Sequence, residues 1–264
     1  MTGQTGASRW SDLGARLATA AVLVTVTVFA FWASGLWLNL YITALVAVTV
    51  WELARMVGAR HETLLAASAG GACLAMALLP PGLGLPLALA PLVLGLLGRV
   101  SRERLAYALF SVGIVLAGYG LIRLNGAHGV LWLVWFVMVV AVTDIAGFFA
   151  GRFFGGPKFW PAISPKKTWS GTVAGWIGAA VVGLGFVLFG PASLAVIPLS
   201  MALSLASQMG DIAESALKRR AGVKDSSNLL PGHGGFFDRF DGVLGAAVML
   251  LLADALTTFP PVAP

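Results

Sequence analysis

Ionisable residues are scarce in this chain of 264 residues. Asp, Glu, Lys and Arg together make up 11% of the sequence, and 58% of the residues are hydrophobic. Soluble domains carry about 25% charged residues. The composition therefore excludes an ordinary soluble protein and indicates an integral membrane protein. No polar block is long enough to fold alone, so we expect a single membrane domain over residues 1–264.

Cysteine and histidine are scarce as well. Cys73 is the only cysteine, which excludes an internal disulfide and a thiolate metal site. His61, His128 and His233 are scattered along the chain, which argues against a zinc site. The excess of 17 basic over 11 acidic residues would suggest nucleic acid in a soluble protein. In a membrane protein the positive-inside rule accounts for it, so we expect no nucleic-acid partner.

Apolar runs follow one another along the whole chain, and each is near the ~20 residues that cross a bilayer. They predict an all-α polytopic membrane protein with about nine transmembrane helices. No convincing small-x-small cleavage site follows the first run, so we expect it to be retained. The runs are approximately 17–33, 36–51, 63–79, 83–97, 105–121, 130–150, 172–189, 194–210 and 243–258.

The distribution of basic residues predicts the orientation. Nine crossings place the two termini on opposite sides of the membrane. If the N-terminus is cytoplasmic, 16 of the 17 basic residues lie on the cytoplasmic side, and only Arg123 lies outside. We therefore expect a multi-pass protein of the inner (plasma) membrane with a cytoplasmic N-terminus. The C-terminal half, residues 141–264, is expected to carry the cytoplasmic loops 151–171 and 211–241, after the N-terminal helices of residues 1–140.

The densest polar segment is residues 211–241, with five carboxylates and five basic side chains. A charged side chain at the bilayer centre costs about 2.5–3.5 kcal/mol, so these ten groups must lie at the membrane surface or line a wet cavity. If the preceding helix continues, Asp211, Ser215 and Lys218 share one face, which Glu214 borders. A solvated loop whose charges only set topology is the alternative.

The end of the same segment favours chemistry on phosphates. Asp238 and Asp241 are three residues apart, so both carboxylates fall on one side of a helical turn. Carboxylate oxygens suit a hard divalent cation such as magnesium. The stretch from Pro231 to Gly235 cannot be a regular helix, and Gly234 and Gly235 in it would let backbone N–H groups approach an anion. Magnesium and phosphate together are the simplest interpretation.

Outside this segment three features carry charge. Lys166 and Lys167 precede a predicted helix start and make an anion site plausible, although such lysines also anchor topology. Asp144 lies inside a predicted span, where it is either functional or the partner of a cation such as Arg152. Two more acids, Glu52 and Asp254, are near span ends and are expected at the membrane interface.

These motifs together resemble the signature of the phosphatidate cytidylyltransferase (CDP-diacylglycerol synthase) family. The resemblance is strong over residues 140–245, whereas the first spans match only in hydrophobicity. One departure is Ser170, where the family has a glutamate. The matching pieces are Asp144 with Gly151-Arg152, Ser164 to Trp169, Ser207 to Asp211, Ser215 to Arg219, Lys224-Asp225 and His233 to Asp241.

The resemblance implies transfer of CMP from CTP to phosphatidic acid in phospholipid biosynthesis, giving CDP-diacylglycerol and pyrophosphate. It also implies a magnesium cofactor and a homodimer. The implied metal ligands are Asp211, Asp238 and Asp241, and the implied catalytic residues are these three with Ser215 and Lys218. The implied substrate-binding residues are Asp144, Lys166, Lys167, Lys224, His233, Gly234, Gly235 and Arg239.

Three other activities are weighed against this one. An ion-coupled transporter would have charges deep in several spans and broken helices in matching halves. A CDP-alcohol phosphotransferase would carry a D-G-x-x-A-R signature, but Val-Leu-Gly-Ala follows Asp241-Gly242 here. A CTP-dependent lipid-alcohol kinase is the closest chemical neighbour, and it remains the main alternative.

Overall fold

The computed structural model describes residues 6–80, 83–100, 102–232 and 234–262, and these are almost entirely helical. Two short helical turns, η1 (Leu85–Leu89) and η2 (Gly95–Arg99), flank the fourth helix. The α-helices are α1 (Gly6–Ala33), α2 (Gly35–Met56), α3 (Glu62–Leu78), α4 (Ala90–Leu94), α5 (Arg104–His128), α6 (Val130–Phe153), α7 (Trp169–Phe189), α8 (Val196–Ala221) and α9 (Phe237–Leu256).

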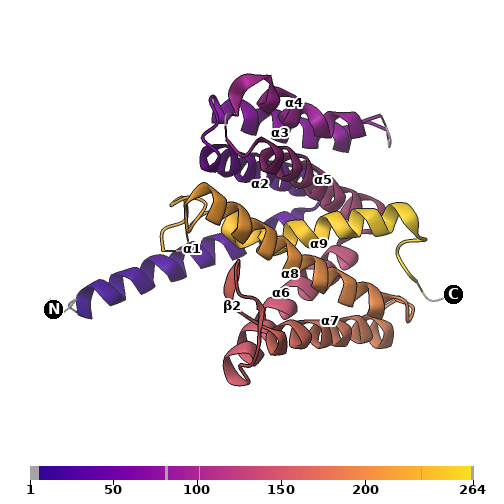
Figure 1. Ribbon diagram of the computed structural model, residues 1–264. Coiled ribbons are helices and arrows are strands. Elements are labelled where there is room, and N and C mark those ends of the chain that lie inside the picture. Colours follow the sequence, from indigo (N-terminus) through magenta and orange to yellow (C-terminus); the bar gives the residue numbers. More distant parts are fainter. Residues whose placement is uncertain (1–5, 81–82, 101, 233, 263–264) are drawn as a thin grey trace.

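The long helices lie side by side, and successive helices run in opposite directions (Figure 1). Helix α1 begins at the end of the molecule that also carries the α6–α7 and α8–α9 connections. Helix α9 ends at the opposite end. The two polar segments predicted from the sequence therefore lie at the same end of the molecule, where their side chains can meet.

The fourth predicted span is not one continuous helix. The structure divides it into η1, α4 and η2, with proline within the first two residues of both η1 and α4. Proline has no N–H to donate, so Pro86 and Pro91 interrupt the hydrogen-bond ladder. The carbonyl of Pro91 accepts a hydrogen bond of 3.0 Å from the hydroxyl of Tyr107, which ties this broken segment to α5.

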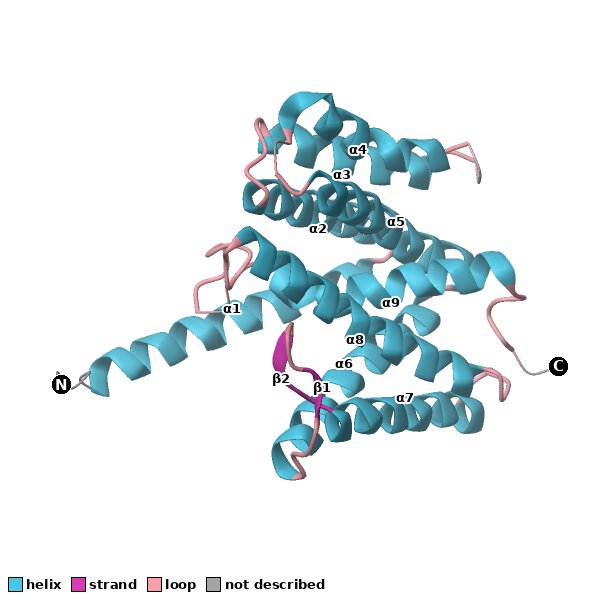
Figure 2. Cartoon of the chain, viewed as in Figure 1, coloured by secondary structure: helices cyan, strands magenta, loops and turns pink. Residues whose placement is uncertain are grey.

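The segment 151–171 contains a hairpin that the sequence analysis missed. Strand β1 (Lys158–Trp160) pairs antiparallel with β2 (Ser164–Thr168), as Figure 2 shows in magenta. Thr168 ends the second strand, and its hydroxyl accepts a hydrogen bond of 3.2 Å from the Gly171 amide, which caps α7. The hairpin therefore fixes Lys166 and Lys167 immediately before a helix start.

Helices α8 and α9 approach each other closely through glycine. A Cβ atom on Gly210 would collide with the Asp241 carbonyl, and one on Gly245 would collide with the Ala206 carbonyl. Small residues allow two helix backbones to come this close. The close contact brings the first two turns of α9 against the part of α8 that begins at Asp211.

Five of the described helices are long and apolar enough to cross a membrane: α2, α5, α6, α7 and α8. Large apolar side chains are exposed on the outer surface, including Trp32 (81%) and Phe189 (90%). So much exposed apolar surface fits a lipid environment. The prediction of an all-α polytopic membrane protein is confirmed, with the short hairpin as an addition to it.

Candidate active site

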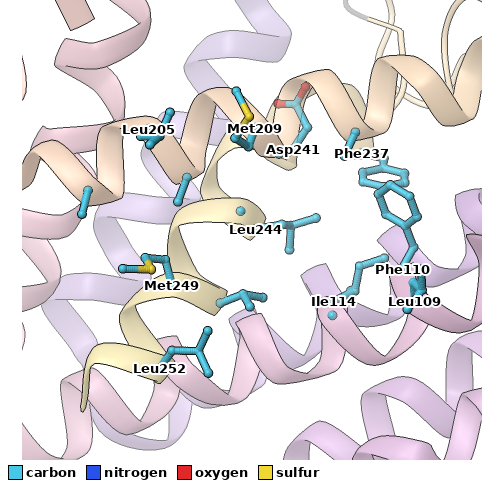
Figure 3. Close-up of a pocket in the computed structure, with 17 residues that line it drawn as sticks. Leu109, Phe110, Ile114, Leu205, Met209, Phe237, Asp241, Leu244, Met249 and Leu252 are labelled. Atoms are coloured by element: carbon cyan, nitrogen blue, oxygen red, sulfur yellow. The ribbon is translucent and has the colours of Figure 1, made fainter. Parts of the chain in front are cut away.

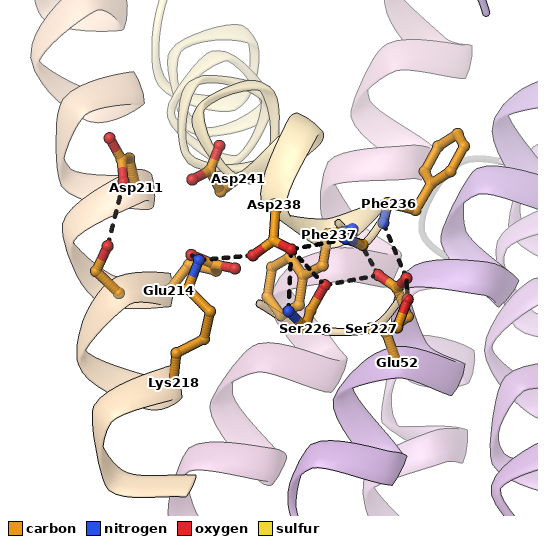
Figure 4. A network of polar contacts seen from close by, with 12 residues as sticks. Glu52, Asp211, Glu214, Lys218, Ser226, Ser227, Phe236, Phe237, Asp238 and Asp241 are labelled. Carbon is orange, nitrogen blue, oxygen red and sulfur yellow. Dashed lines mark hydrogen bonds and ion pairs between the residues drawn. The ribbon is translucent and has the colours of Figure 1, made fainter. Parts of the chain in front are cut away.

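Three carboxylates converge where α8 meets α9. Asp211 and Glu214 lie one turn apart on α8, and Asp241 lies in the second turn of α9 (Figure 4). One oxygen of each carboxylate lies within 4.8 Å of the others. We call these three residues the acidic cluster. Its oxygen-only donor set suits a hard divalent cation such as Mg²⁺.

Lys218 balances part of this negative charge. Its Nζ lies 2.6 Å from Glu214 Oε2 and 2.6 Å from Asp238 Oδ1. Glu214 is fully buried, and neither of its oxygens has a hydrogen bond of good geometry to another described residue. The contact with Lys218 is therefore an ion pair without hydrogen-bond alignment. A buried carboxylate with so few partners fits a cation-binding role.

Asp238 is fully engaged within the protein. Its Oδ1 accepts from Lys218, and its Oδ2 accepts from the Ser226 amide (2.9 Å) and the Gly235 amide (2.8 Å), while the Ser226 hydroxyl lies 3.1 Å away, between Asp238 and Glu52. Burial opposes ionisation of Asp238, but the hydrogen bonds from Lys218 and the backbone outweigh it and lower its pKa. Metal ligation by Asp238 would require its Oδ1 to leave Lys218.

Asp241 has the opposite electrostatic environment. It lies before the ninth predicted span, and burial together with the charge of Asp211 raises its pKa to about 7. Carboxylates this close repel one another, and a cation between them removes that conflict. The acidic cluster therefore fits a divalent metal in its geometry and in its electrostatics.

A polar pocket of about 440 Å³ opens beside the cluster, between α6, α7, α8 and the hairpin. Lys167 on the hairpin lies 2.5 Å from Asp211 Oδ2, so the pocket borders the acidic cluster. Its wall contains both signs of charge, from Asp144, Arg152, Lys166, Lys167 and Asp211. The structure thus brings the predicted substrate-binding residues Asp144, Lys166 and Lys167 next to the predicted metal ligand Asp211, from a distant segment of the sequence.

An apolar pocket of about 650 Å³ lies on the other side of the cluster, between α5, α8 and α9 (Figure 3). Asp241 is the one charged residue in its lining, at one end of an otherwise apolar wall. Leu109, Leu205 and Leu252 line the pocket and are 66%, 41% and 52% exposed, so it is open along its outer side. Asp211 in the polar pocket and Asp241 here thus connect the two pockets through the acidic cluster.

The remaining predicted residues lie around this centre. The Ser215 hydroxyl donates to Asp211 Oδ1 over 3.3 Å, as their spacing of four predicts. Lys224 in the loop after α8 and Arg239 in the first turn of α9 are exposed. The Gly234 amide donates to the Leu230 carbonyl, so both glycine amides have protein partners, and their contact with an anion stays a prediction. His233 lies outside the described residues.

Two acidic residues, Glu214 and Glu52, make contacts that were not predicted from the sequence. Glu214 was predicted only to border the face of Asp211, although their spacing of three already places both on one turn. Glu52 was expected at the membrane interface, which stays a prediction; its side chain is completely buried and accepts hydrogen bonds from the start of α9. Its position at the end of α2 carries no sign that α9 begins beside it.

Fold and site together define a polytopic helical membrane protein with an acidic cluster between a charged pocket and an apolar one. The sequence model of the cytidylyltransferase family matches residues 14–256. The chain belongs to this family, which confirms the resemblance seen in the sequence.

Individual relatives agree with this assignment. A phosphatidate cytidylyltransferase of Brucella suis is 36% identical over 262 residues, which are 96% of this chain and 97% of that protein. Its counterpart from Brucella melitensis matches equally well. A phosphatidate cytidylyltransferase of Staphylococcus saprophyticus is 37% identical over 149 residues, which are 55% of this chain and 57% of that protein.

Two basic residues of α8, Lys218 and Arg220, give a test of this geometry. Lys218→Met keeps the side-chain stem but leaves two buried carboxylates without their cation, so it should lower the free energy of unfolding by about 3 kcal/mol. Arg220 is 67% exposed and lies 3.8 Å from Glu103, so Arg220→Met should cost less than about 1 kcal/mol. Reversible denaturation in detergent micelles measures both, and equal losses would contradict the arrangement.

Proposed function

We propose that this protein transfers CMP from CTP to phosphatidic acid, giving CDP-diacylglycerol and pyrophosphate for phospholipid biosynthesis. The names of the relatives support this substrate pair. One structural observation gives the proposed reaction its strongest support: a charged pocket and an apolar pocket border the same acidic cluster. A site that joins a nucleotide to a membrane lipid needs both environments in contact.

The polar pocket is the proposed site for CTP. Its volume lies within the range of about 300–1,000 Å³ that is typical of small-molecule sites. Lys166, Lys167 and Arg152 would provide positive charge for the phosphates, and Asp144 is part of the same wall. The exposed side chains of Lys224 and Arg239 add positive charge from the α8–α9 side.

The apolar pocket is the proposed site for the acyl part of phosphatidic acid. Its lateral opening would let a chain enter directly from the bilayer, since Leu109 and Leu252 on its rim are exposed. The lipid phosphate would then lie near Asp241, at the end of the pocket that touches the acidic cluster. Two anions must meet there, so positive charge from Lys167 and Lys218 is needed close by.

The acidic cluster is the proposed magnesium site, with Asp211, Glu214 and Asp241 as ligands. Magnesium bound there would neutralise negative charge on the phosphates and polarise a phosphoryl oxygen. Ser215 would orient Asp211 through its hydrogen bond, and Asp238 would hold Lys218 in place. The set differs from the ligands implied by the sequence motif in that Glu214 takes the place of Asp238.

The proposed reaction requires the protein mainly to position the two substrates and to offset their negative charge. An oxygen of the lipid phosphate forms a bond to the α-phosphorus of CTP, and the bond from that phosphorus to the bridging oxygen of pyrophosphate breaks. The attacking group is already an anion, so no general base is strictly required. Lysine side chains that offset the charge of both substrates and of departing pyrophosphate would supply most of the rate gain.

Carboxylate-to-amide variants test the proposal. With CTP, phosphatidic acid and Mg²⁺, the purified protein should form CDP-diacylglycerol and pyrophosphate. Asp211→Asn and Asp241→Asn keep size but remove charge, and each should lower kcat by at least about a hundred-fold. Asp254→Asn, which changes an ion pair with Arg123 elsewhere on α9, is the matched control and should retain activity.

Product identification by mass spectrometry decides between this reaction and its neighbour. A lipid-alcohol kinase would release CDP and would not incorporate CMP into lipid. Near wild-type turnover by Asp241→Asn in Mg²⁺ would refute the assignment of the cluster.

Nine crossings of the inner membrane with a cytoplasmic N-terminus are also part of the proposal. Alternation of the helices supports it, because α1 begins and α9 ends at opposite ends of the molecule (Figure 1). The excess of basic residues in the connections at the α1 end favours the cytoplasm for that end. A reporter fused after Pro264 should be active only outside the cytoplasm. Cytoplasmic activity of that fusion would contradict the orientation.

A further inference from the structure

A buried glutamate from the N-terminal half of the chain contacts the start of α9. Glu52 on α2 is completely buried and accepts four hydrogen bonds. Oε1 accepts from the Ser227 hydroxyl (2.5 Å) and the Phe236 amide (2.8 Å). Oε2 accepts from the Ser226 hydroxyl (3.1 Å) and the Phe237 amide (2.6 Å). Each oxygen therefore holds one hydroxyl and one backbone N–H.

These hydrogen bonds satisfy both the first amides of α9 and the buried carboxylate of Glu52. The first amides of a helix have no acceptor within the helix, and a negative charge is favourable at that end. A buried carboxylate in turn needs several donors. Glu52 thus caps α9 from another helix and holds the preceding loop at Ser226 and Ser227.

The contacts continue from Glu52 to the acidic cluster (Figure 4). The Ser226 hydroxyl lies 3.1 Å from both Glu52 Oε2 and Asp238 Oδ2. Asp238 Oδ1 is bonded to Lys218, whose ammonium is also paired with Glu214 of the cluster. A continuous polar path therefore leads from α2 in the N-terminal half to the proposed metal ligands on α8.

The glycine at position 235 fits this interpretation. A Cβ atom there would collide with the Ser226 hydroxyl and would lie 2.9 Å from Glu52 Oε1. The space that a side chain would fill is the space that this polar path occupies. Packing against Glu52 and Ser226 therefore accounts for Gly235 without any ligand.

We propose that Glu52 is a positioning residue for the active site: it fixes the loop before α9 and, through Ser226, Asp238 and Lys218, the position of Glu214. The proposal gives the N-terminal helices a part in the reaction. It rests on the proposed function only where it assigns the acidic cluster to catalysis.

Glu52→Gln is an informative variant because its shape is nearly unchanged. A glutamine has one acceptor oxygen, and its NH₂ group donates. Since each carboxylate oxygen of Glu52 accepts one backbone N–H, the NH₂ group must face the amide of either Phe236 or Phe237 in either orientation. The hydroxyls can reverse their role, but a backbone amide cannot. One buried N–H then loses its acceptor.

The experiment compares Glu52→Gln with Asp254→Asn in the full-length protein. Glu52→Gln should lower kcat about ten-fold or more while the KM for CTP changes less than about three-fold. Hydrogen exchange in peptides covering residues 234–240 should accelerate, and exchange in α7 should stay unchanged. Asp254→Asn should keep kcat within about two-fold of wild type and leave exchange at 234–240 unchanged.

Wild-type kcat and wild-type exchange in Glu52→Gln would overturn the proposal. Equal losses of kcat in both variants at equal loss of thermal stability would do the same. If Glu52→Gln does not fold, Ser226→Ala takes its place, because it leaves both amides on Glu52 and still interrupts the path. An unchanged kcat in Ser226→Ala would then overturn the proposal. Exchange needs no substrate, so it separates failure of this inference from failure of the proposed function.

Discussion

Repulsion between carboxylates held at close range is the constraint on which the site depends. Asp211, Glu214 and Asp241 have ligand oxygens within 4.8 Å of one another, in a protein with few charges. Lys167 pairs with the first of them and Lys218 with the second. Two ammonium groups leave part of the negative charge uncompensated, because Lys218 also serves Asp238. A divalent cation would complete the balance, and phosphates bound to it would account for the basic side chains in the adjoining pocket.

The helices around the cluster place two unlike pockets next to it. Close packing at Gly210 and Gly245 presses α8 against α9 and brings their carboxylates together. On one side the hairpin places Lys166 and Lys167 in the wall of the polar pocket. On the other side α5 completes an apolar pocket that is open along its outer side. Both pockets border the acidic cluster, through Asp211 and Asp241.

Much of the candidate site was predictable, because charged residues in a mostly apolar membrane protein must lie together at the membrane surface or in a wet cavity. The scarcity of ionisable residues located the site in residues 211–241, and helical spacing placed Asp211, Ser215 and Lys218 correctly on one helix. The motif pattern gave the family. Glu52 could not be found this way, since its partners are backbone amides that lie almost 200 positions away. The hairpin and the division of the fourth span depend on local turns and prolines that a hydrophobicity pattern averages out.

Binding of a divalent cation to the acidic cluster tests the account most directly. Mn²⁺ can stand in for Mg²⁺, and electron paramagnetic resonance measures the free ion while purified protein is titrated without nucleotide. The account predicts saturable binding by the wild type and by Asp254→Asn, and a loss of that binding in Asp241→Asn. Equal saturable binding by Asp241→Asn, or none by the wild type, would contradict the claim that these carboxylates form a metal site.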